Sequence, residues 1–186
     1  MTNMIKLEEL FQTLESKDNN IRYEAFKKLL ELTERKVDWV YDYWQTLVDK
    51  LSSGNSYHRS IGLMLLANLT LSDSEDKFSE IEERYYSFFD DEKFITARQC
   101  LQNVWRVAVN KEVYRLSVIE ALQRAYSGNV HLERNPNLIK QDIIFSLKKI
   151  ANFYNDSKLD REMEALILKE TDRKIQKSLR DVIVTA

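Results

Sequence analysis

The sequence predicts an all-α protein, and three observations carry that prediction. Only three glycines and one proline occur among 186 residues, so little interrupts a helix. Residues that favour helices fill most of the chain, and apolar residues recur at helical spacing from one end to the other. No segment alternates apolar and polar positions with β-branched side chains, so we expect no strands.

Polar turns divide the first part of the chain into four predicted helices. Each has an apolar face at helical spacing, and glycine at Ser53-Gly54-Asn55 is typical of a helix terminus. The predicted helices are Met4–Glu15, about Asp18–Lys36 with Ile21, Ala25, Leu29 and Leu32 buried, Trp39–Leu51 after Asp38 as cap, and about Tyr57–Leu71.

Six further helices are predicted in the remainder. They run from Ser72–Ser74 to Phe88, from Asp90–Glu92 to Ala108, from about Asn110 to Tyr126 with Val113 inside, from Pro136 to about Ile150, from Leu159 to Ile167, and onward from about Asp172. The segment 129–136 is expected to be the longest non-helical piece and a mobile loop.

The ten helices form five consecutive pairs, and the second helix of each pair repeats one pattern. A row of apolar residues recurs in these second helices: Ala25, Leu29 and Leu32; Gly62, Leu66 and Leu69; Ala97, Leu101 and Val104; Ile143, Leu147 and Ile150; Leu179, Ile183 and Ala186. Because one pair cannot bury its own apolar face, neighbouring pairs are expected to stack on one another. The alternative is a non-repetitive helical bundle.

The best copy of this pattern, Asp18-x-x-Ile21-Arg22-x-x-Ala25-x-x-x-Leu29, resembles the second helix of a HEAT repeat. Polar caps at Asp18, Asn55, Asp90 and Asp172, with cations at Arg22, Arg59 and Lys140, recur in the other copies, while Phe94 and Gln176 depart from it. The resemblance covers nearly the whole chain. It implies a right-handed α-α superhelix of about five HEAT-like pairs, residues 1–186 forming a single domain.

A helical-repeat array of this kind implies a binding surface on the second helices. Projection at 100° per residue places one column of side chains opposite the core row. The column also includes Glu34 and Gln141, and its predicted partner-binding residues are Tyr23, Lys27, Leu30, Met64, Leu71, Ile95, Gln99, Gln102, Arg106, Phe145 and Lys148. The apolar members would form a groove for a helix or an extended peptide. The alternative is that neighbouring helices or a second copy of the chain bury them.

Charge is divided between the two sets of helices, although the formal net charge of the chain is only −2. Acidic residues dominate the first helices, and cations dominate the second. A basic inner layer would attract an acidic or amphipathic protein segment. The competing interpretation is that Arg22, Arg59 and Lys140 serve as structural partners of nearby acids.

Motifs for catalysis are poor, so we expect a non-enzymatic module without cofactors. His58 and His131 are far apart, and no metal-ligand spacing, phosphate loop or nucleophile elbow occurs. Cys100 lies among apolar residues at helical spacing and is expected to be a buried thiol. Its being the single cysteine fits a reducing compartment, and no stretch approaches the length of a membrane span, so a cytoplasmic protein is expected.

The alternative function is DNA binding, with or without base excision. The segment Asp91–Ile95 with Arg98 and Trp105 is faintly similar to HEAT-like DNA glycosylases of the alkylation-repair type. That activity would need a carboxylate beside aromatic residues on a strongly basic concave face. Glu34 is the only carboxylate of the projected column. The column also has too few cations for strong nucleic-acid binding.

Overall fold

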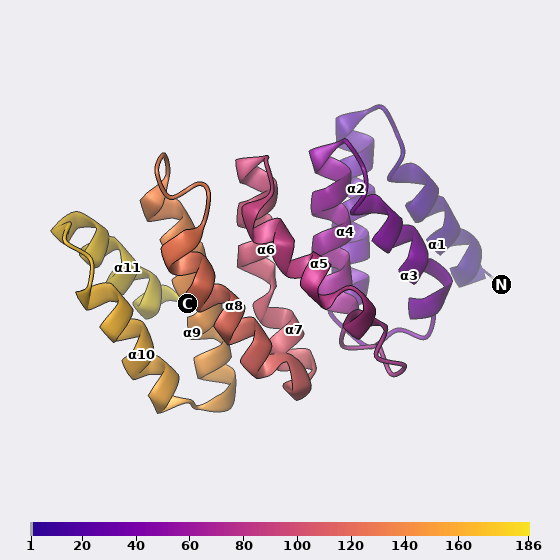
Figure 1. Ribbon diagram of the computed structural model, residues 1–186. Coiled ribbons are helices and arrows are strands. Elements are labelled where there is room, and N and C mark those ends of the chain that lie inside the picture. Colours follow the sequence, from indigo (N-terminus) through magenta and orange to yellow (C-terminus); the bar gives the residue numbers. More distant parts are fainter. Residues whose placement is uncertain (1) are drawn as a thin grey trace.

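A computed structural model describes the backbone of residues 2–186 and the side chains of residues 6–186. Met1, the first residue of the predicted domain, lies outside the described residues. Within them, every regular element is a helix, which confirms the all-α prediction (Figure 1). The helices are α1 (Thr2–Thr13), α2 (Asn19–Thr33), α3 (Val40–Lys50), α4 (Ser56–Leu69), α5 (Glu82–Ser87), α6 (Phe94–Asn103), α7 (Trp105–Asn110), α8 (Arg115–Gly128), α9 (Pro136–Tyr154), α10 (Ser157–Leu168) and α11 (Arg173–Thr185). Short 3₁₀ helices occupy Lys77–Glu80, Phe88–Asp90 and Glu112–Tyr114.

Side-chain caps begin several of these helices, largely where the sequence predicts them. The carboxylate of Asp18 accepts hydrogen bonds from the N–H groups of Asn20 and Ile21, at 2.8 and 3.2 Å. Asn55 and Asp172 cap α4 and α11 in the same way. Asp38 is not a cap, because α3 starts one residue later, after Trp39, without a side-chain cap. Asp90 is also not one: it accepts the N–H of Val130 instead.

Two predicted helices are interrupted in the structure. The fifth is a succession of 3₁₀ helix, α5 and 3₁₀ helix, and the sixth breaks at Val104 into α6 and α7. In an unbroken helix the Leu101 carbonyl would accept the N–H of Trp105. Here it accepts the hydroxyl of Ser146, which reaches in from α9. A side chain inserted into the backbone ladder in this way is a known cause of a sharp helix bend.

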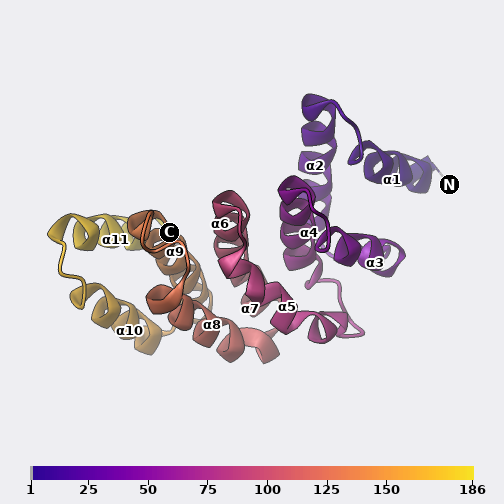
Figure 2. The ribbon, with the colours of Figure 1, turned by 45° about the horizontal axis from the view of Figure 1, so that its top comes forward.

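The helices are arranged as consecutive pairs side by side along a curved row (Figures 1 and 2). The second helices form a continuous series, since α2 packs on α4, α4 on α6, α6 on α9, and α9 on α11. The first helices α1, α3, α5, α8 and α10 lie on the other side of this series (Figure 2). Contacts between helices therefore continue without interruption from α2 to α11.

The apolar rows predicted for the second helices are buried, with exceptions in α2 and α11. The predicted rows of α4, α6 and α9 are buried throughout. In α2, however, Ile21 and Leu32 are 53% and 43% exposed, and the buried face instead includes Phe26 and Thr33. In the last row only Leu179 is fully buried. Val113, predicted to be inside, is 75% exposed.

A close approach of α3 and α4 depends on Gly62. A Cβ atom at this position would lie 2.9 Å from the backbone carbonyl oxygen of Leu47 and 3.1 Å from the side chain of Leu51. Any other residue would therefore push the two helices apart.

Buried and partly buried ion pairs join successive helix pairs, and we call the following three the ion-pair ladder. Its members are Arg59–Asp91, with nitrogen–oxygen distances of 2.7 and 2.8 Å, Arg98–Asp142 at 2.6 and 3.0 Å, and Lys140–Glu170 at 2.7 Å. Arg59 and Lys140 are thus structural partners of acids, as the competing interpretation of the charge pattern predicts. Arg22, the third cation of that interpretation, instead donates to the Ser16 carbonyl and to the side-chain oxygen of Asn19. In α6, Phe94 stands at the position where the repeat pattern expects a cation. Arg98, one turn later, forms the ion pair of this helix instead.

The non-helical segment 129–135 is tied to the preceding helix pair. The Asn129 side-chain amide donates to the Phe89 carbonyl at 2.6 Å, and Nε2 of His131 lies 2.7 Å from the Asp91 carbonyl oxygen. No non-helical segment of the described chain is longer, although residues 70–76 form one of equal length. That second segment arises because the fifth helix starts only at Lys77.

Candidate functional site

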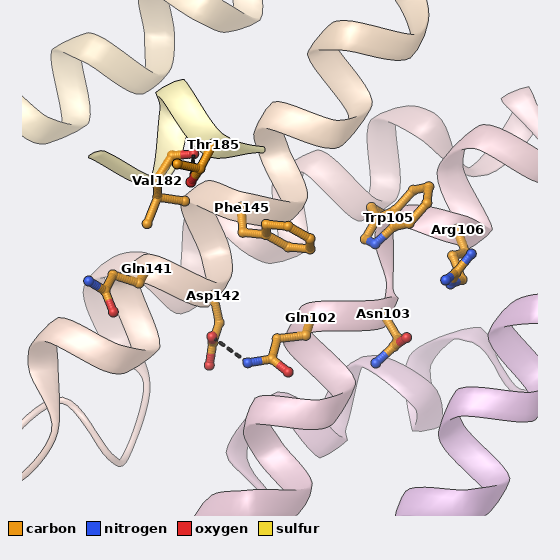
Figure 3. Close-up of a pocket in the computed structure, with 9 residues that line it drawn as sticks. All are labelled: Gln102, Asn103, Trp105, Arg106, Gln141, Asp142, Phe145, Val182 and Thr185. Carbon is orange, nitrogen blue, oxygen red and sulfur yellow. Dashed lines mark hydrogen bonds between the residues drawn. The ribbon is translucent and has the colours of Figure 1, made fainter. Parts of the chain in front are cut away.

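The row of second helices contains a groove with a volume of about 420 Å³. It lies where the α6–α7 break faces α9 and the last turn of α11 (Figure 3). Its lining residues come from three helix pairs and are Gln102, Asn103, Trp105, Arg106, Gln141, Asp142, Phe145, Val182 and Thr185. A volume of this size suits a small molecule or a few side chains of a protein segment.

Four lining residues lie on the column that the sequence predicts: Gln102, Arg106, Gln141 and Phe145. The other five were missed. Trp105 is not on the projected column because the projection assumes a continuous helix, whereas the chain breaks at Val104 between α6 and α7. Val182 and Thr185 belong to the final turn of α11, which the repeat pattern describes least well.

Two walls differ in chemistry (Figure 3). Val182, Phe145 and Trp105 follow one another along one wall, while Gln141, Asp142, Gln102 and Asn103 follow one another along the opposite wall. Arg106 lies at the end of the groove nearest α4. The groove thus combines an apolar wall, a polar wall and one terminal cation.

The carboxylate of Asp142 is not available for chemistry. It is buried, accepts hydrogen bonds from Nε and Nη2 of Arg98 in the ion-pair ladder, and accepts a third from the Gln102 side-chain amide at 2.7 Å. The hydrogen bonds that Arg98 donates to Asp142 raise the pKa of Arg98. The pair is therefore neutral as a unit and serves to join α6 to α9.

Arg106 has no such partner. Its Nε atom is buried without a hydrogen bond, and no carboxylate in the described chain lies within ion-pair distance of its guanidinium. Burial lowers the pKa of Arg106, and the more distant Glu34 acts in the opposite direction. An arginine remains charged nevertheless. The side chain rests on the ring of Trp105, with 4.6 Å from Cζ to the ring centroid.

Because an unpaired charge is costly to desolvate, we expect Arg106→Met to raise the free energy of unfolding, by up to about 1 kcal/mol. Methionine keeps the contact with Trp105 and removes the charge. Chemical denaturation would measure the change. Arg124→Met is the control, since Arg124 is 71% exposed and its removal is expected to be neutral. A clear loss of stability in Arg106→Met would contradict the view that this cation is unsatisfied.

The remaining predicted binding residues lie away from the groove. Tyr23, Lys27 and Ile95 are exposed, and Lys27 pairs with Glu24 at 2.7 Å. Leu30, Met64, Leu71 and Gln99 are half-buried, with Leu30 and Met64 packed against the core. Lys148 pairs with Asp160 of α10 at 2.8 Å. The structure thus brings only Gln102, Arg106 and Phe145 of the eleven into one site.

Outside the groove, the described residues offer neither an accessible thiol nor a metal site. Cys100 is buried, its thiol faces the Tyr85 carbonyl, and burial raises its pKa. Side chains of His, Cys, Asp and Glu nowhere gather in the described chain into a group that could hold a metal ion. No helix between residues 2 and 186 is both long and apolar enough to cross a lipid bilayer.

Comparison with known proteins adds no family to this picture. No protein-family model matches the chain, and a search of curated proteins finds no match.

Proposed function

We propose that the chain is a non-enzymatic, HEAT-like helical-repeat module of the cytoplasm, which binds a protein segment in the groove. The stacked pairs, the buried second-helix rows and the ion-pair ladder support a repeat array, whose right-handed course is part of the proposal. The observation that carries the binding function is the groove itself. It spans three helix pairs and ends at a cation without a partner.

The chemistry of the groove favours binding over catalysis. The one carboxylate in its lining is fully engaged by Arg98 and Gln102, so it cannot act as a general base without breaking the ion-pair ladder. The DNA-binding and glycosylase alternatives gain no support, because the projected cations Lys27 and Lys148 are both paired with acids.

We expect Phe145→Glu to weaken partner binding roughly 30-fold, the effect of losing a contact worth about 2 kcal/mol. Phe145 is the aromatic residue at the centre of the apolar wall, and a carboxylate there would face Val182 and Trp105 (Figure 3). Affinity capture from lysate with the wild type identifies partners, and titration of a purified partner measures the loss.

The matched control is Phe153→Glu, which makes the same substitution on the same helix outside the groove, at a side chain that is 60% exposed. It should bind as the wild type does. Equal binding by all three folded proteins would contradict a binding role for the groove.

A further inference from the structure

We infer that the groove selects a peptide segment with an acidic residue next to a large apolar one, the carboxylate binding Arg106. This inference rests on the proposed function and specifies the partner of the same site. Three properties of the groove carry it: its charge, the state of its cation and the arrangement of its two walls.

The charge of the groove is positive although it contains one acid and one base. Asp142 is neutralised by Arg98, which lies on α6 and does not line the groove. Arg106 is consequently the only uncompensated charge among the lining residues. A basic segment would find no free carboxylate in the groove, whereas an acidic one would meet a partly desolvated cation without a protein partner.

The state of Arg106 makes it suited to a carboxylate in particular. Contact with Trp105 holds its guanidinium while the nitrogen atoms have no protein acceptor. A planar guanidinium can donate two parallel hydrogen bonds to one carboxylate. Because the group is already half-buried, part of its desolvation cost is borne before a ligand arrives, and the new bonds form in a site partly shielded from water.

The two walls specify the rest of the segment. Phe145 and Trp105, on the wall that leads to Arg106, offer a surface for a large apolar side chain next to the acidic residue (Figure 3). On the opposite wall, Gln102 and Asn103 each use the amide nitrogen within the protein and leave the carbonyl oxygen without a protein partner. Such oxygens can accept the N–H groups of a peptide backbone.

Selection from a random twelve-residue peptide library displayed on phage tests this inference. Wild-type protein is expected to enrich peptides in which Asp or Glu adjoins Phe, Trp, Leu or Met. Arg106→Gln and Arg106→Glu should not enrich them, and a synthetic copy of an enriched peptide should bind Arg106→Gln at least about tenfold more weakly. Replacing its acidic residue by the amide should weaken binding to the wild type by a similar factor. Arg124→Glu, which changes an exposed cation of α8, is the control and should enrich the wild-type set.

The outcomes separate this inference from the proposed function. Peptides that lack an acidic residue, or that bind Arg106→Gln unchanged, but are lost with Phe145→Glu would overturn the inference and leave groove binding intact. A wild type that enriches no peptide, or only peptides insensitive to Phe145→Glu, would overturn both. Arg106-dependent binding of a mixed-sequence oligonucleotide without any acidic peptide would assign the cation to nucleic acid and also overturn it. Thermal unfolding of each variant confirms that it is folded.

Discussion

Replacing Asp91 by alanine is expected to lower the free energy of unfolding by about 3–5 kcal/mol, the range for breaking a buried ion pair from one side. Arg59 is only 8% exposed, and both of its bonds to Asp91 would be lost. Glu92 lies 3.7 Å from the guanidinium but is largely solvent-exposed, so it can replace Asp91 only in part. The Lys93 N–H at the start of α6 would also lose its acceptor. Urea denaturation would measure the change.

Two further variants identify the cause of that loss. Glu92→Ala removes an exposed acid beside the same arginine and should change stability by less than about 0.5 kcal/mol. The double variant Arg59→Met/Asp91→Leu removes both charges and should be more stable than Asp91→Ala alone, because no buried charge is left unpaired. If the double variant were the less stable of the two, an uncompensated Arg59 would not be the reason for the effect.

Gly62→Leu is expected to destabilise the protein by about 3 kcal/mol, at the upper end of the range for overpacked cores. The Cβ atom alone would approach the Leu47 carbonyl to 2.9 Å, and the rest of the leucine would have to fit between α3 and α4. Gly62→Ala should also destabilise, although alanine is favoured over glycine by about 1 kcal/mol within a helix. Denaturation curves would show the free energy of unfolding falling from the wild type to Gly62→Ala and again to Gly62→Leu.

Gly128 supplies the comparison for this prediction. It ends α8, and no atom lies within 4 Å of a Cβ built there. Gly128→Ala should therefore be neutral or slightly stabilising, whereas Gly62→Ala should destabilise the protein. A stabilised Gly62→Ala would mean that α3 and α4 can separate at little cost.

The helices and most of the second-helix rows could be predicted from sequence because they depend on short-range spacing. In α2, where Leu32 is exposed and Thr33 is buried, the spacing of apolar residues predicts the wrong core residue. Thr33 is buried in preference to Leu32 because its hydroxyl bonds the Leu29 carbonyl and accepts the side-chain amide of Asn68. A polar residue whose hydrogen bonds are satisfied can occupy a core position. The partner in this case lies on α4, which the local pattern of α2 does not reveal.

The groove could be predicted only in part, for a related reason. Its position depends on the break at Val104, and that break depends on Ser146 of α9, which is remote in sequence. Likewise, Asp142 looks like an available acid until Arg98 is found beside it. Periodicity assigns residues to faces of helices. It does not tell which charges on adjacent faces neutralise one another.

The hydrogen bond from Ser146 to the Leu101 carbonyl also joins α9 to α6, two of the helices that supply the lining residues of the groove. Ser146 follows Phe145 of the apolar wall, and Leu101 precedes Gln102 of the polar wall. A change in the distance between α6 and α9 would have to break this bond or the neighbouring Arg98–Asp142 pair. The width of the groove is therefore set before a ligand enters, and a segment that fits loses little affinity to the ordering of the protein. A segment too wide for it would have to separate α6 from α9.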